Sequence, residues 1–190
     1  MMTGLYTVIY FLLSAFFSLA GTLLCLRIAL RYMQFSTLNP FCHIIYTLLQ
    51  PILGVFDKHA PKSFNPRYDY VALLGFLTLT LLKFILFSFL LYGALISYYN
   101  LALLTLADFI IIPCNLLFFI ILARVLVSWL QPLNQSFFMP VLMVLSNPAL
   151  RLGKRFVPPI SGLDFSPMFI MIALKCITIF TYNALPISLG

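Results

Sequence analysis

Three charged residues interrupt apolar stretches of this chain, and two of them have the types and spacing of an ion pair. Lys83 follows Asp69 by fourteen residues, and Asp108 precedes Arg124 by sixteen. At about 1.5 Å per residue, these separations place them roughly 21 Å and 24 Å along neighbouring helices. A charge at the bilayer centre costs about 2.5–3.5 kcal/mol on insertion scales. We therefore predict an intramembrane Lys83–Asp108 pair; the alternative is that Asp108 lies at the outer interface and Lys83 extends to water.

The third charge, Lys175, lies eleven residues after Asp164, about 16 Å along a helix. The sequence offers it no obvious acidic partner. A protonated lysine at this depth needs a carbonyl, water, a lipid phosphate or another subunit, and a neutral lysine is the alternative. We therefore expect Lys175 to indicate either a homo-oligomer or a polar internal path.

Residues that catalyse reactions or bind metals are not grouped in any recognisable pattern. The two histidines, His43 and His59, lie on different predicted elements, and no glycine-rich phosphate loop occurs. The four cysteines are scattered without a C-x-x-C pair: Cys25, Cys42, Cys114 and Cys176. Acid–base catalysis by Asp69 and Asp164 would require one shared pocket. We therefore expect no enzymatic activity, no metal and no cofactor.

The composition indicates a membrane protein. The chain has 190 residues, of which 63% are hydrophobic and 8% charged, and its mean hydropathy is +1.10. A soluble domain carries about 25% charged residues. Four apolar runs of spanning length lie at about residues 6–26, 70–98, 103–130 and 167–185. The net charge is +7, but the basic residues mostly flank these runs, so we expect the lipid bilayer as partner and no nucleic acid.

A polar segment occurs twice, each time between two apolar runs. The copies align without a gap from their first arginine to their second proline. The first contains Arg27, Asn39-Pro40, Gln50-Pro51, Lys58, Pro61 and Asp69; the second contains Arg124, Gln131, Phe138, Asn147-Pro148, Arg155, Pro158 and Asp164. We predict an all-α membrane protein with one membrane domain and four transmembrane helices. They would form two parallel repeats, residues 1–100 and 101–190, each with an interfacial amphipathic helix in its cytoplasmic loop.

The first interfacial helix is predicted from its start signals. Asn39 is a suitable N-cap, and Pro40 suits the first helical position. The apolar face would contain Phe41, Ile44, Ile45, Leu48 and Leu49. We expect Pro51 to bend or restart the chain. Whether this face meets lipid or protein stays open.

The second interfacial helix is expected to end at Pro148. Its predicted apolar face contains Phe138, Val141, Leu142 and Leu145. A basic turn formed by Arg151, Lys154 and Arg155 would then contact anionic lipid headgroups, each residue contributing about 1 kcal/mol near the surface.

The two aspartates are predicted to act as structural latches at the headgroup level. Asp69 is placed to cap the second span. Asp69 and Asp164 would each return to the arginine of their own repeat, Arg27 or Arg124, or to Lys58 or Arg155. The alternative is that Arg27 and Arg31 serve only as topology anchors. Because both motif loops carry basic residues and the middle loop and both ends carry none, we expect cytoplasmic loops and periplasmic termini.

Together these motifs resemble the YggT (also YlmG) family of small bacterial integral membrane proteins, over nearly the whole chain. The most specific piece is Gly162-Leu-Asp-Phe-Ser-Pro-Met168, which includes Pro167; Asp69-Tyr70 in the first copy lacks the Ser-Pro. The resemblance implies a bacterial inner-membrane protein linked to cell division, cell shape, or osmotic and potassium stress. Plastid relatives are associated with nucleoid distribution and haem attachment, but neither His43 nor His59 matches a family motif. No catalytic activity or substrate comes with the resemblance.

Two functions follow as expectations. The first is a non-enzymatic inner-membrane scaffold or assembly factor that presents its basic loops to lipid headgroups and other membrane proteins. The alternative is a small oligomeric ion channel or transport component, with Lys83, Asp108 and Lys175 lining a path.

Overall fold

The computed structural model describes residues 2–34, 40–57, 68–130, 138–157 and 164–185, most of which lie in six helices. The helices are α1 (Met2–Tyr32), α2 (Pro40–Asp57), α3 (Tyr70–Tyr92), α4 (Tyr98–Leu130), α5 (Met139–Phe156) and α6 (Ser166–Asn183). Since no strand occurs in these ranges, the predicted all-α class is confirmed. Asn39, Lys58, Pro61 and Pro158 lie outside the described residues.

Four of the helices are long and apolar enough to cross a membrane. Their candidate spans are Tyr6–Tyr32, Tyr70–Tyr92, Tyr98–Ser128 and Ser166–Asn183. Each corresponds to one of the four apolar runs, so the chain is a multi-pass membrane protein.

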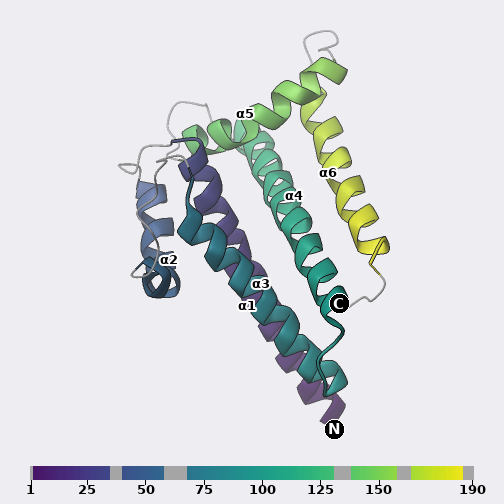
Figure 1. Ribbon diagram of the computed structural model, residues 1–190. Helices are drawn as coiled ribbons and strands as arrows, with labels where there is room; N and C mark the ends of the chain where they lie inside the picture. The colour runs from purple at the N-terminus through teal and green to yellow at the C-terminus, as the bar shows by residue number, and fades with distance from the viewer. Residues whose placement is uncertain (1, 35–39, 58–67, 131–137, 158–163, 186–190) are drawn as a thin grey trace.

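The spans form two antiparallel pairs, α1 with α3 and α4 with α6. An 18-residue connecting helix lies between the members of each pair in the chain, α2 in the first and α5 in the second (Figure 1). α1 packs against α3, α4 packs against α6, and α3 and α1 both contact α4. α5 lies across the ends of α4 and α6, whereas α2 packs beside α1 and α3 toward the same end of the bundle. The order of span, connecting helix and span thus occurs twice. The internal repeat and the membrane orientation stay predictions.

The main core lies where the two connecting helices, α2 and α5, contact the spans. Its buried side chains come from α1 to α5 and include Leu24, Leu30, Ile45, Leu49, Leu53, Phe76, Leu116, Val141 and Leu145. The described part of α6 buries only Ser166 and Thr178, so α6 contributes little to this core.

The turn between α3 and α4 differs from the predicted boundaries. α3 ends at Tyr92 and α4 begins at Tyr98, whereas the apolar runs predicted that one helix would end near residue 98 and the next would begin near residue 103. Gly93 adopts a φ of 67°, a left-handed conformation that closes the helix C-terminus. Ser88 Oγ donates to Ala94 O at 2.6 Å and accepts from Ile96 N at 2.8 Å. The turn therefore has internal hydrogen bonds that hydropathy does not reveal.

Pro148, which was expected to end a helix, lies inside one, and Pro51, which was expected to bend or restart the chain, does not end its helix. α2 continues through Pro51, and α5 continues through Pro148. An interior proline costs about 3 kcal/mol or more in a helix because one hydrogen bond is lost and the ring clashes with the preceding turn. Here each helix buries apolar side chains on both sides of its proline, Leu49 and Leu53 in α2 and Leu145 and Leu150 in α5. This packing favours a continuous helix.

The buried face of α2 is also rotated from the predicted one. Cys42, Ile45, Leu49 and Leu53 are buried, whereas Ile44 and Leu48 are 55% and 57% exposed. The predicted stripe mixed residues that pack on the neighbouring spans with residues that point away from them. α2 therefore faces protein on one side and still presents apolar side chains on another.

Candidate functional site: an intramembrane ion pair and two arginine–aspartate motifs

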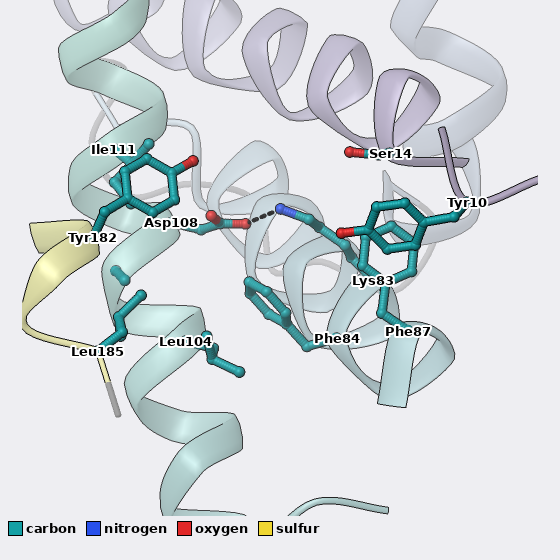
Figure 2. A pocket seen from close by; sticks show the side chains of 11 residues that line it. Tyr10, Ser14, Lys83, Phe84, Phe87, Leu104, Asp108, Ile111, Tyr182 and Leu185 are labelled. Carbon is teal, nitrogen blue, oxygen red and sulfur yellow. Dashed lines mark hydrogen bonds and ion pairs between the residues drawn. The ribbon is translucent and has the colours of Figure 1, made fainter. Parts of the chain in front are cut away.

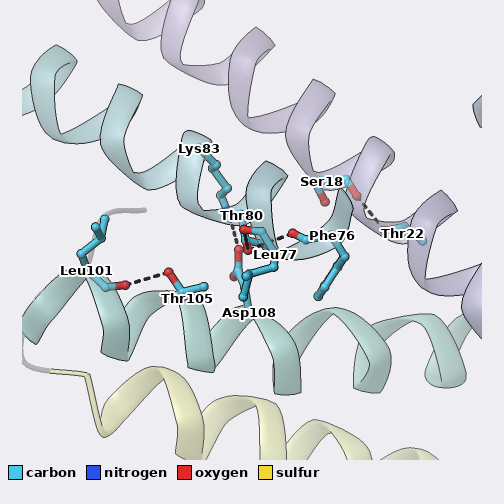
Figure 3. Close-up of polar contacts among 9 residues, drawn as sticks. All are labelled: Ser18, Thr22, Phe76, Leu77, Thr80, Lys83, Leu101, Thr105 and Asp108. Carbon is cyan, nitrogen blue, oxygen red and sulfur yellow. Dashed lines mark hydrogen bonds and ion pairs between the residues drawn. The ribbon is translucent and has the colours of Figure 1, made fainter. Parts of the chain in front are cut away.

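Lys83 and Asp108 are in direct contact, as their depths predicted. Lys83 Nζ on α3 lies 2.7 Å from Asp108 Oδ2 on α4 (Figures 2 and 3). The two side chains are only 17% and 8% exposed. Lys83 Nζ also lies 4.7 Å from the ring centroid of Phe84, so the ammonium meets an aromatic face as well as a carboxylate. The pair joins the first half of the chain to the second.

The ion pair lines a cavity of about 110 Å³ (Figure 2). Residues from all four candidate spans surround it: Tyr10 and Ser14 from α1, Phe84 and Phe87 from α3, Leu104 and Ile111 from α4, and Tyr182 from α6. A cavity of this size has room for several water molecules, and it contains the polar groups that ordered water requires. Sequence reasoning missed Tyr10, Ser14 and Tyr182, whose only signal was a hydroxyl within an apolar run.

Hydroxyl groups near the pair are satisfied by their own helices. Thr80 Oγ1 donates to Phe76 O at 3.0 Å, and Thr105 Oγ1 donates to Leu101 O at 2.8 Å (Figure 3). Such bonds to the preceding turn are the usual way to satisfy a hydroxyl in lipid. The polar character of the cavity therefore comes mainly from the ion pair and the groups that line it.

Lys175 bonds to a carbonyl oxygen within the chain, which is one of the partners that its position led us to expect, so it does not require another subunit. Its Nζ donates to Asn115 Oδ1 on α4 at 3.0 Å and lies 4.5 Å from the ring centroid of Phe118. The sequence argument compared depths only for acidic side chains and therefore did not identify Asn115. Asn115 precedes Arg124 by nine residues, about 14 Å, which matches the depth of Lys175. The depth comparison used for Lys83 would have found this amide.

In the first motif, Asp69 closes onto the arginines of α1. Its Oδ2 lies 2.9 Å from Arg27 Nε and 3.2 Å from Arg31 Nη1, and the side chain is fully buried. Its Oδ1 accepts from Ala72 N at 3.1 Å and caps α3. Burial opposes ionisation of Asp69, but these hydrogen bonds and the two positive charges outweigh it and lower its pKa. The predicted latch and cap are both present.

In the second motif, the aspartate and the arginine have separate partners. Asp164 Oδ2 pairs with Lys154 Nζ at 3.0 Å, rather than with Arg124 or Arg155 as predicted. Because α5 continues through Pro148, the predicted basic turn is helical, and Lys154 reaches the start of α6. The hydrogen bonds from Ser166 and the charge of Lys154 lower the pKa of Asp164, although partial burial opposes this shift.

Arg124 bonds to neutral groups instead. Its Nη1 donates to Ser146 Oγ at 2.7 Å and to Asn147 Oδ1 at 2.9 Å. Both acceptors lie on α5. Asn147 occupies the position of Gln50 in the first copy, and this shared amide type was the only sequence signal for its role.

The site as a whole is an arrangement of charges that have partners within the chain. Within the described ranges, no group of three or more His, Cys, Asp or Glu side chains could hold a metal ion. Lys83 is paired with Asp108, Arg27 and Arg31 share Asp69, and the exposed Arg151 and Arg155 lie at the end of the bundle. This geometry stabilises and orients helices, and it leaves positive charge on one face of α5.

Comparison with known proteins identifies the family. The family model described as CCB3/YggT matches residues 6–90 and 103–185, one stretch in each half. "Uncharacterized protein YggT" of Escherichia coli (strain K12) is 29% identical over 167 residues, which are 88% of this chain and 85% of that protein. "Uncharacterized protein in proC 3'region" of Vibrio alginolyticus is 29% identical over 166 residues, 87% of this chain and 88% of the relative. No solved structure matches. The chain belongs to the CCB3/YggT family.

Proposed function

We propose that the protein is a non-enzymatic membrane scaffold or assembly factor, and that α5 presents the surface on which partners assemble. One observation carries this proposal: each of the lysines and arginines described above within the bundle has a partner inside the chain, while the basic end of α5 is exposed. Arg151 and Arg155 are exposed. On the same helix, Leu145, Leu150 and Gly153 are buried against the neighbouring spans. The arginines are thus held on a packed helix rather than on a flexible loop.

The ion-channel alternative receives less support. It was based on three charges along one path, yet Lys175 bonds to Asn115 and neither residue lines the cavity around Lys83 and Asp108. A conducting path requires sites that ions enter and leave readily. A lysine already neutralised by a carboxylate at 2.7 Å is a poor site of this kind. The polar cavity is the one feature in favour of a channel.

The scaffold would act in the bacterial inner membrane, with both termini periplasmic and the motif loops cytoplasmic. In this orientation, Arg151 and Arg155 face the anionic lipid surface, where each basic residue contributes about 1 kcal/mol of attraction. Other membrane proteins are the expected partners, and a homo-oligomer is one form that such an assembly takes. Cell division, the envelope and osmotic-stress homeostasis are the processes in which we place it, because family resemblance suggests them.

The proposal is tested by photo-crosslinking from position 152 of the full chain in native membranes. Leu152 is 53% exposed and lies between the basic residues of α5. We expect a discrete crosslinked protein in the wild type, which the double change Arg151→Gln and Arg155→Gln removes. The matched control, Arg151→Lys with Arg155→Lys, keeps the charge and should retain the crosslink.

Two outcomes would overturn the scaffold. One is a crosslinking pattern that is identical in the Gln and Lys variants at equal membrane levels. The other is ion flux through wild-type proteoliposomes that Lys83→Met abolishes, which would establish the channel instead.

A further inference from the structure

We propose that a groove between α4, α5 and α6 binds one anionic phospholipid, with its phosphate on Arg124 and an acyl chain along the groove. This site is separate from the exposed arginines of the proposed function and does not depend on that function. The groove has a volume of about 790 Å³, within the roughly 300–1,000 Å³ range of ligand pockets. Its wall is largely apolar and includes Ile121, Leu126, Met139, Met143, Leu150, Met168 and Met171.

The charge of Arg124 suits a phosphate. Among the described residues, its hydrogen bonds both come from Nη1 and both go to neutral oxygens, on Ser146 and Asn147. Its Nε and Nη2 donors can therefore take two oxygens of one phosphate side by side, the geometry in which arginine binds phosphate best. The equivalent Arg27 already has a carboxylate, Asp69, at 2.9 Å. Arg27 and Arg31, the described arginines of the first half, therefore both face a carboxylate, whereas Arg124 does not hydrogen-bond to one.

The two charged groups of the groove both contact α5, and apolar side chains continue deeper along α4 and α6. Arg124, six residues before the end of α4, bonds to Ser146 of α5, and Asp164, two residues before the start of α6, pairs with Lys154 of α5. Ile121 lies about one helical turn deeper on α4, and Met168 and Met171 lie one to two turns deeper on α6. A bound lipid would therefore point its headgroup and its chain in the same directions as its neighbours in the bilayer.

The side chains of the wall suit an acyl chain. Four methionines line the groove, and their unbranched, flexible thioethers adapt to a mobile hydrocarbon. Met168 is 59% exposed and Leu126 is 44% exposed, whereas Met139 and Leu150 are buried. The groove therefore opens sideways from a packed floor, on faces of α4 and α6 that belong to candidate spans. Hydrocarbon chains are the molecules present there.

Local charge favours an anionic headgroup over a zwitterionic one. Asp164, the acidic residue of the groove, is already paired with Lys154, which leaves Arg124 as net positive charge. The exposed Arg151 and Arg155 lie on the same helix as Lys154 and add to the positive potential. Basic pockets between transmembrane helices on the cytoplasmic side are typical sites for anionic lipid headgroups.

The test is native mass spectrometry of the full chain in mild detergent, titrated with phosphatidylglycerol or phosphatidylcholine of equal chain length. We expect one phosphatidylglycerol to bind the wild type, and Arg124→Gln to weaken this binding roughly tenfold or more. The matched control is Arg31→Gln, which removes an arginine from the other half and should bind normally. Met168→Trp, which fills the open side of the groove and keeps Arg124, should also weaken binding.

Each of the following outcomes would contradict the proposed phospholipid site. Equal binding of phosphatidylcholine, or equal losses in Arg31→Gln and Arg124→Gln, would mean non-specific lipid adsorption. Displacement of the lipid by inorganic phosphate alone would mean a simple anion site. A dimer that forms without added lipid and is lost in Met168→Trp would mean that a second copy of the chain fills the groove.

Discussion

In the first half of the chain, Asp69 is fully buried between Arg27 and Arg31, whereas in the second half 38% of the Asp164 side chain is exposed beside Lys154. The sequence places an arginine before and an aspartate after the polar segment in both halves. The structure closes the first motif into a buried ion-pair cluster and leaves the second open. A shared pattern of residue types therefore does not determine which charges meet.

The position of the connecting helix in each half explains why the first motif is closed and the second is open. α2 packs along α1 and α3, with Leu53 against Gly75, and leaves Arg27 free to reach the start of α3. α5 instead crosses the ends of α4 and α6. It brings Lys154 to Asp164, and Ser146 to Arg124. α5 thus gives Arg124 and Asp164 separate partners.

The largest expected effect is at the ion pair that joins the two halves. Lys83→Asp or Asp108→Lys alone places two like charges in the cavity, so each should cost at least about 3–5 kcal/mol of unfolding free energy. The exchange of both residues restores opposite charges and should recover much of that loss. Membrane levels and thermal unfolding in detergent measure both effects. A double variant no better than either single change would show that the contact does not stabilise the chain.

The second prediction contrasts the closed and open motifs directly. Asp69→Asn can still cap α3, but it leaves Arg27 and Arg31 without a carboxylate, so we expect a loss of about 3 kcal/mol. Asp164→Asn removes a half-exposed pair, worth about 0–1 kcal/mol. Thermal unfolding of the two variants in one detergent tests the contrast. Equal losses would mean that burial does not distinguish the two motifs.

The loss of stability at low pH should depend more on Asp69 than on Asp164. The folded-state pKa of Asp69 lies below its ordinary value, so its stabilising effect is present above about pH 4 and is lost as the pH falls further. Asp69→Asn should therefore flatten the acid limb of the stability profile. The pKa of Asp164 is also lowered, but its pair with Lys154 is half-exposed. Asp164→Asn should therefore leave most of the loss of stability at low pH unchanged.

Sequence was sufficient wherever depth along a helix decided the answer. It predicted the all-α class, the four apolar spans and the contact of Lys83 with Asp108. It failed at Pro148, because the packing that keeps α5 continuous comes from distant residues, and at Pro51 it left open a restart that does not occur. It allowed a carbonyl partner for Lys175 but did not identify Asn115, because depths were compared only for acidic side chains. It also failed at Asp164, since the reach of Lys154 depends on where α5 lies.

The smallest predicted effect on stability concerns the glycines at which the connecting helices pack on the spans. A Cβ at Gly153 would lie 2.7 Å from Ile170 Cγ1 and 3.2 Å from the backbone oxygen of Ser166, so Gly153→Ala must move α5 away from α6. A Cβ at Gly75 would lie 2.7 Å from Leu53 Cδ2, the movable end of a side chain. Alanine gains up to about 1 kcal/mol over glycine in a helix. Overpacking costs about 1–3 kcal/mol. We therefore expect Gly153→Ala to lower the unfolding temperature and Gly75→Ala to leave it nearly unchanged or raise it. The opposite order would mean that α2, rather than α5, is the more tightly docked helix.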